Sequence, residues 1–190
     1  ASWADKVKSL SKAWILAVKF PVNNSKVSEL SQGNPTQASA NSVFVSGDDV
    51  YVIGSEYNGT ILTARLWKNK EEPVQLFGTE NQSSASDVFV TNNNVYALGY
   101  EAIPNVGIVG KLWKNSEVTN FNSDGKDFFP RKIWAQGNDE YIIGSSRGGT
   151  TISQAVLFKN GEMTILSESE SYVSSRALGL FVEEITTIKQ

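Results

Sequence analysis

Short apolar runs separated by polar turns fill most of the chain, and they recur with a period of about 45 residues. The run at residues 42–54 returns at 87–99 and again at 132–144. Each run is rich in β-branched and aromatic residues and is interrupted by a Gly, Asn and Asp turn, which is typical of a β-hairpin. The pattern therefore predicts a pair of antiparallel strands that occurs three times.

Each copy continues into a third and a fourth apolar run. The third run ends in Lys-Asn after an aromatic residue, at Trp67, Trp113 or Phe158. A polar turn and a last short run complete the unit. Four antiparallel strands within about 45 residues are typical of a β-propeller blade, whereas helical repeats carry a 3.6-residue period.

The two ends of the chain resemble the two halves of one further unit. Residues 13–20 and 26–30 match the second half of a repeat, and residues 177–182 match its start. A ring that pairs its own ends leaves no free sheet edge. The sequence therefore predicts an all-β fold, a four-bladed β-propeller of one domain with the last blade formed jointly by N- and C-terminal strands. The expected blades are 38–80, 83–124, 128–168, and 13–31 with 175–190.

A half-ring is the alternative architecture, because two copies that exchange terminal half-blades could also close into a ring. We therefore expect a monomer, with a domain-swapped dimer as the alternative.

The repeat resembles those of bacterial β-propeller proteins, whose units read Val-Tyr-Val-x-Gly followed later by Leu-Trp-Lys-Asn-Gly. The resemblance covers residues 13–182 and implies the propeller fold. In size and blade count the chain is also similar to hemopexin-type propellers. Those usually join their ends by a disulfide, which this cysteine-free chain cannot form. Neither resemblance assigns a functional residue.

The composition narrows the chemistry. The chain has no cysteine and no histidine, which excludes thiol nucleophiles, imidazole-dependent hydrolases and the commonest metal ligands. Its 17 basic residues are scattered and its net charge is -3, so we expect no nucleic-acid partner. No apolar run is long enough to span a membrane. We expect no cofactor and no metal site.

The composition of the chain predicts its cellular location. Serine, threonine, asparagine and glycine are abundant, which is typical of exported bacterial β-proteins. The chain starts at Ala1 without a methionine, which fits either a mature exported protein or a trimmed chain. The expected location is extracytoplasmic, whether periplasmic, cell-surface or secreted.

The loops between second and third strands are where the copies differ most, and loops on a rigid frame often carry specificity. The candidate ligand-binding residues in these loops are Tyr57, Tyr100, Glu101 and Arg147. Unconstrained drift of a surface loop is the alternative explanation. A second loop, at 122–129, contains Asp124, Lys126, Asp127, Phe128 and Phe129, and its phenylalanines could equally be buried between blades.

Other recurring residues have structural explanations. The aromatic residues of the third strand could form a platform for sugars, but strict recurrence favours packing between blades. Acid pairs such as Asp48-Asp49, Glu71-Glu72 and Glu183-Glu184 suggest a glycosidase, yet the first two pairs fall in predicted turns. The first strands place Asp87 level with Asn41 and Lys132, so no acidic ring forms there.

The leading functional hypothesis is a non-catalytic binding or protein-interaction module, with a protein or a carbohydrate as its ligand. One alternative is a lectin-like carbohydrate-binding protein with several equivalent pockets between blades. A further alternative is a carbohydrate-active enzyme that uses a carboxylate pair. The sequence supplies no set of catalytic residues.

Overall fold

The computed structural model describes residues 14–17, 26–29, 37–69, 71–122, 125–148, 152–167 and 174–182, which contain strands and no helix. Sheet 1 consists of β3 (Ala38–Ser46), β4 (Asp49–Tyr57), β5 (Leu62–Lys68) and β6 (Val74–Gln75). Sheet 2 consists of β7 (Ser83–Thr91), β8 (Asn94–Ile103), β9 (Gly107–Lys114) and β10 (Glu117–Phe121). Sheet 3 consists of β11 (Asp127–Gln136), β12 (Asp139–Arg147), β13 (Ser153–Lys159) and β14 (Glu162–Ile165). The all-β expectation is confirmed.

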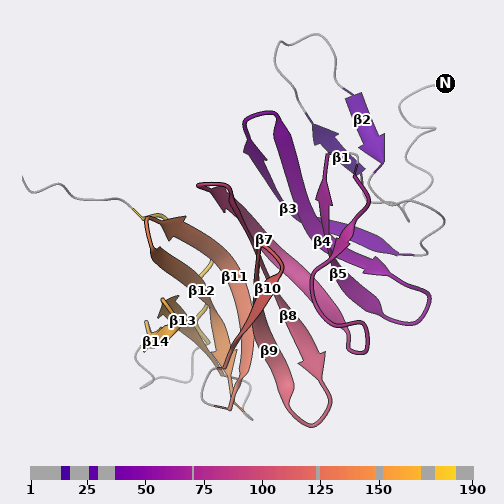
Figure 1. Ribbon diagram of the computed structural model, residues 1–190. Helices are drawn as coiled ribbons and strands as arrows, with labels where there is room; N and C mark the ends of the chain where they lie inside the picture. Colours follow the sequence, from indigo (N-terminus) through magenta and orange to yellow (C-terminus); the bar gives the residue numbers. More distant parts are fainter. Residues whose placement is uncertain are drawn as a thin grey trace, which may run out of the picture.

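Each sheet is an antiparallel meander in which neighbours in sequence are neighbours in space. The first strands of the three sheets pack against one another, β3 on β7 and β7 on β11. The three sheets follow each other side by side like blades (Figure 1). The arrangement is therefore propeller-like, with β3, β7 and β11 as its inner strands.

A bulge in every inner strand explains the recurring glycines. The register of the first hairpin shifts between Ala40 and Ser42, and at the same place in sheets 2 and 3. Opposite each bulge the second strand carries a glycine, at Gly54, Gly99 or Gly144. A Cβ atom on Gly99 would overlap the carbonyl oxygen of Ser84. The glycine is required because the bulge brings the two backbones too close for a side chain.

The Lys-Asn sequences at the ends of β5, β9 and β13 fasten two turns together. Asn69, Asn115 and Asn160 have positive φ angles of 54°, 48° and 51°, which asparagine tolerates. The side-chain oxygen of Asn69 accepts a hydrogen bond from the backbone of Val50 at 2.9 Å, and its amide donates to Asp49 at 2.7 Å. Asn115 and Asn160 bind the corresponding turns in sheets 2 and 3. The recurring asparagine therefore joins the end of the third strand to the turn between the first two strands of its sheet.

Apolar side chains from consecutive sheets form the core. Val88 and Val90 of β7 pack onto the face of sheet 1 that carries Ile53 and Leu66. Ile133 and Ala135 of β11 occupy the same positions against sheet 2. In the opposite direction, Trp113 packs against the sheet 1 cluster and Phe158 contacts Phe121 of sheet 2. Trp113 and Phe158 therefore pack between sheets, and Trp67 is buried at 2% exposure.

A ladder of aromatic rings links the inner strands. Phe44 and Phe89 have ring centroids 5.1 Å apart, and Phe89 and Trp134 are 5.0 Å apart. The ladder continues from Trp134 to Phe181, at 5.7 Å. Phe181 thus extends the row of first-strand aromatics, although residues 174–182 form no strand.

The predicted fourth blade is not assembled. β1 (Trp14–Ala17) and β2 (Lys26–Glu29) pair with each other in a separate two-stranded sheet. Residues 174–182 lie along sheet 3, where the backbone of Ser175 donates to Ser153 at 2.8 Å. The described sheets are therefore not closed into a ring. Residues 183–190, which the sequence assigns to the same blade, lie outside the described residues.

Replacing Gly99 by alanine should lower the free energy of unfolding by about 1–3 kcal/mol, because the new methyl group must displace the bulge. Gly179→Ala is the matched control, since a Cβ atom there meets nothing within 4 Å. Urea denaturation of both variants measures the difference. Equal stabilities would show that the bulge does not require glycine.

Replacing Asn69 by alanine should raise the pKa of Asp49. In the native protein the hydrogen bond from Asn69, followed by that from Lys68, holds this pKa below its usual value of 3.8. Because its pKa is lowered, the charged Asp49 carboxylate stabilises the fold at pH values above the ordinary pKa of 3.8. This stabilisation is lost as the pH falls through the lowered pKa. Carboxyl NMR titration measures the shift. Asp139, whose partner Asn160 is intact, should titrate unchanged in the same sample.

Candidate functional site

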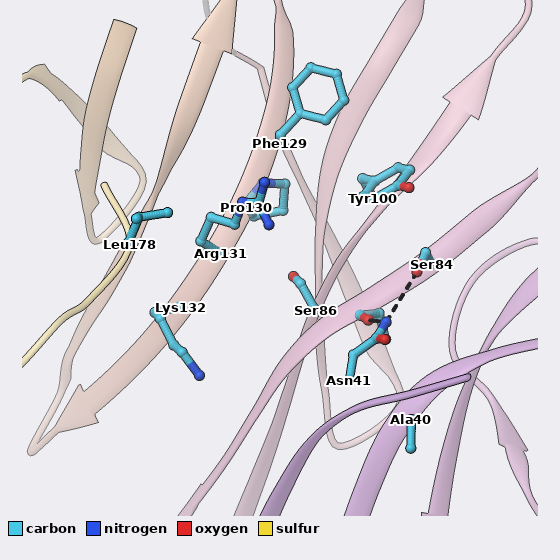
Figure 2. A pocket seen from close by; sticks show the side chains of 11 residues that line it. Ala40, Asn41, Ser84, Ser86, Tyr100, Phe129, Pro130, Arg131, Lys132 and Leu178 are labelled. Carbon is cyan, nitrogen blue, oxygen red and sulfur yellow. Dashed lines mark hydrogen bonds between the residues drawn. The ribbon is translucent and has the colours of Figure 1, made fainter. Parts of the chain in front are cut away.

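A cavity of about 620 Å³ lies at the start of the three inner strands. The extra residue of each bulge lines it: Asn41 in β3, Ser86 in β7 and Arg131 in β11. Leu178, from residues 174–182, completes this set, and it follows Ala177 as Arg131 follows Pro130. A bulge redirects a side chain, so one variable residue from each unit faces the same cavity, called the inner cavity below (Figure 2).

Two aromatic side chains form one part of the wall. Tyr100 of β8 and Phe129 of β11 line the inner cavity, and their rings meet edge to face with centroids 6.1 Å apart. The guanidinium group of Arg147 lies 5.3 Å from the Phe129 ring centroid and 3.7 Å from a carboxylate oxygen of Asp127. Arg147 therefore contacts a ring of the aromatic wall without being part of the cavity lining.

Neutral polar groups form a second part of the wall. The Asn41 amide donates to the carbonyl oxygen of Ala85 at 2.7 Å, which fixes its orientation. Ser84 and Ser86 line the inner cavity beside it, and Figure 2 shows the contact between Asn41 and Ser84. The side-chain oxygen of Asn41 and the two hydroxyl groups can therefore bond a ligand's hydroxyl groups.

Two cations complete the polar lining. Lys132 donates from Nζ to Asp87 at 2.8 Å, and Asp87 also accepts from Ser42 Oγ at 2.8 Å and from the backbone of Ile133 at 3.0 Å. We call this arrangement the Asp87 bridge. Arg131 is exposed at the cavity.

The strand register corrects one detail of the sequence analysis. Ser42 is the residue level with Asp87, and Asn41 is the extra residue of the bulge.

The four predicted ligand residues separate in the structure. Tyr100 lines the inner cavity, and Arg147 contacts its aromatic wall. Tyr57, at the end of β4, is outside the lining. Glu101 is buried: its carboxylate lies 2.8 Å from Lys111 Nζ and 3.0 Å from the Asn81 amide.

The burial of Glu101 is part of a repeated structural pair. In sheet 1, Glu56 and Arg65 form the corresponding ion pair at 3.4 Å. In sheet 3, Ser146 and Val156 stand at these two positions. A buried ion pair in two of the three sheets indicates a role in holding β4 to β5 and β8 to β9.

The second predicted loop also divides. Phe128 is fully buried and contacts Phe158, with ring centroids 4.9 Å apart, whereas Phe129 lines the inner cavity. Lys126 bonds Gln154, and Asp127 accepts from the backbone of Ile108. Asp124 lies outside the described residues. One phenylalanine is thus in the core and the other at the cavity.

The bulge residues were missed by the sequence reasoning. Asn41, Ser86 and Arg131 lie within strands that otherwise repeat closely, whereas the candidate ligand residues were predicted in the loops. The available signal was variation at a single position, 45 residues apart, inside a repeated strand.

Other chemistry is limited in the part of the chain that the structure describes. Those residues contain no group of three or more acidic side chains that could hold a metal ion. The described residues also form no helix that is long and apolar enough to cross a membrane. The acid pair Glu71-Glu72 is exposed, and Glu183-Glu184 lies outside the described residues.

Comparison with known proteins yields structural matches only. No protein-family model matches the chain, and no curated protein matches its sequence. One solved structure that it resembles is a fucose lectin from Kordia zhangzhouensis in complex with methyl-fucoside, at 11% identity and a TM-score of 0.51. The match covers 68% of this chain and 99% of the lectin chain.

A second match is a GH32 β-fructofuranosidase from Bombyx mori, at 12% identity and a TM-score of 0.37, covering 68% of this chain and 36% of that one. The lectin and the enzyme are both β-propellers. At this level of identity the similarity to the lectin is one of fold.

Proposed function

We propose that the protein is a non-catalytic carbohydrate-binding module that holds one sugar unit in its inner cavity. The observation that carries the proposal is the convergence of one bulge residue from each inner strand on a cavity with an aromatic wall. The volume of about 620 Å³ lies within the range of about 300–1,000 Å³ that is usual for small-ligand sites.

The lining matches the chemistry of a sugar. One face of a pyranose ring is apolar and packs on aromatic rings, which Tyr100 and Phe129 supply. Its hydroxyl groups need donors and acceptors at fixed positions, which Asn41 and the serines supply. A fold shared with a fucose lectin supports the same class of ligand, and fucose itself is one member of that class to test.

The lining supports binding rather than hydrolysis. Glycoside hydrolysis uses two carboxyl groups placed on either side of the sugar bond. The described wall instead consists of aromatic, amide, hydroxyl, aliphatic and cationic side chains. Asp87, which lies behind Lys132, is already occupied by three donors.

Replacing Tyr100 by alanine should weaken sugar binding about tenfold, because it removes half of the aromatic wall. Titration calorimetry against methyl-fucoside and a panel of other neutral methyl glycosides measures the effect. Tyr57→Ala, the same change outside the cavity lining, should leave the affinity unchanged. The proposal fails if no glycoside binds, or if both variants, still folded by thermal melting, lose affinity equally.

We also propose that residues 13–31 and 175–190 complete a fourth blade and close the ring. Val43 and Val45 of β3 are 53% and 61% exposed, whereas Val88 and Val90 at the same positions of β7 are 3% and 8% exposed because sheet 1 covers them. β3 therefore has the apolar face of a strand that packs on a preceding blade.

Residues 174–182 supply the matching evidence from the other end of the ring. The Ser175 hydroxyl accepts a hydrogen bond from the backbone of Ala155 at 3.0 Å, as the Ser83 hydroxyl does from Ala64 at 2.9 Å. Ser83 begins an inner strand, so Ser175 is placed to begin the next one. Phe181 then falls at the position of Phe44, Phe89 and Trp134.

Val45→Asp tests closure. In a closed ring the new charge is buried and the free energy of unfolding should fall by several kcal/mol. Val118→Asp on the outer strand β10 is the matched control, since Val118 is 47% exposed and remains at the periphery. Urea denaturation compares the two. Equal losses would contradict closure, and a solution mass measurement tells a closed monomer from an exchanged dimer.

The extracytoplasmic location and the bacterial source stay predictions. Fractionation of the cells that produce the protein tests the location directly.

A further inference from the structure

We propose that the sugar unit bound in the inner cavity is acidic, and that Arg131 binds its carboxylate. This inference rests on the proposed carbohydrate-binding function and names the class of sugar. Apart from Tyr100, the ionisable side chains of the wall are those of Arg131 and Lys132, and both are cationic.

One of the two cations is already neutralised. Lys132 lies 2.8 Å from the Asp87 carboxylate, whose side chain is 7% exposed, so the pair is held together within the Asp87 bridge. The two cations carry a charge of +2 and Asp87 carries -1, which leaves one positive charge at the cavity. That charge belongs to Arg131.

Arg131 is available to a ligand. Among the residues that the structure describes, none forms a hydrogen bond or an ion pair with it, and its side chain is exposed at the cavity. The other arginine near the aromatic wall, Arg147, is engaged by Asp127 and by the Phe129 ring. A planar guanidinium group binds a carboxylate through two parallel hydrogen bonds, which gives direction as well as charge.

Arg131 lies close to the aromatic wall, so one ligand can contact both. The residue follows Pro130 in the β11 bulge, and Phe129 precedes Pro130, so the charge and the aromatic wall come from one short segment. Figure 2 shows Arg131 and Lys132 on β11 and the side chains of Asn41 and Ser84 on the neighbouring strands. A uronic acid offers an apolar ring face, hydroxyl groups and a carboxylate, and these three features match the three kinds of wall.

Paired glycosides test the inference. Methyl glucuronide and methyl glucoside differ only at C6, which is a carboxylate in the first and a hydroxymethyl group in the second. Methyl galacturonide and methyl galactoside differ in the same way. Each of the four is titrated into the native protein at low salt by calorimetry. We expect the acidic member of at least one pair to bind about tenfold more tightly. Arg131→Gln should remove this preference, so that the acidic and the neutral member of the pair bind the variant with the same affinity.

The control for lost charge is Lys159→Gln. Lys159 is paired with Asp139 at the turn end of sheet 3, away from the cavity, so its variant should keep the preference. Thermal melting confirms that both variants fold.

The outcomes separate the inference from the proposed function. Neutral glycosides that bind as tightly as their acidic partners overturn the acidic-sugar inference and leave carbohydrate binding in place. A preference that survives in Arg131→Gln overturns the role of Arg131. If no glycoside binds, the proposed function itself fails. If acetate competes as well as the glucuronide does, the cavity recognises the carboxylate alone, and the sugar assignment is wrong.

Discussion

The carboxylate of Asp87 joins the three four-stranded sheets, and the geometry of the inner strands depends on it. Asp87 belongs to sheet 2, accepts a hydrogen bond from Ser42 of sheet 1, and accepts two from Lys132 and Ile133 of sheet 3. It is 5% exposed, so its charge is stabilised by these donors rather than by water. Because the inner cavity lies at the same end of β3, β7 and β11, the Asp87 bridge also fixes the distance between its walls.

The bulges give a rigid repeat one residue that is free to vary. The glycine opposite each bulge is required, since a Cβ atom on Gly54, Gly99 or Gly144 would overlap the first strand. The bulge residue itself, such as Asn41 or Arg131, faces the cavity. The same local irregularity therefore brings the two backbones together and turns a variable side chain toward the inner cavity.

The repeat made much of the fold predictable, because strands, turns and packing aromatics all leave a periodic signal. The three four-stranded sheets follow from it, as does the packing of Phe158 between sheets. The face of the sheet to which each side chain points was harder to predict. Tyr100 and Glu101 are adjacent, yet the first faces the cavity and the second forms a buried ion pair, and the sequence does not show which side each one takes. A bulge present in every copy leaves the period unchanged, so the residues that it redirects were also hidden.

Residues 174–182 connect the inner cavity to the proposed closure of the ring. Leu178 lines the inner cavity, and Phe181 continues the aromatic ladder from Trp134. The segment that supplies these two residues is held to sheet 3 through Ser175. A ligand that contacts Leu178 as well as the inner strands binds more tightly when the segment is docked, and by linkage it stabilises that docking. In a ring whose last blade comes from the chain ends, occupancy of the cavity and completion of the fold therefore favour each other.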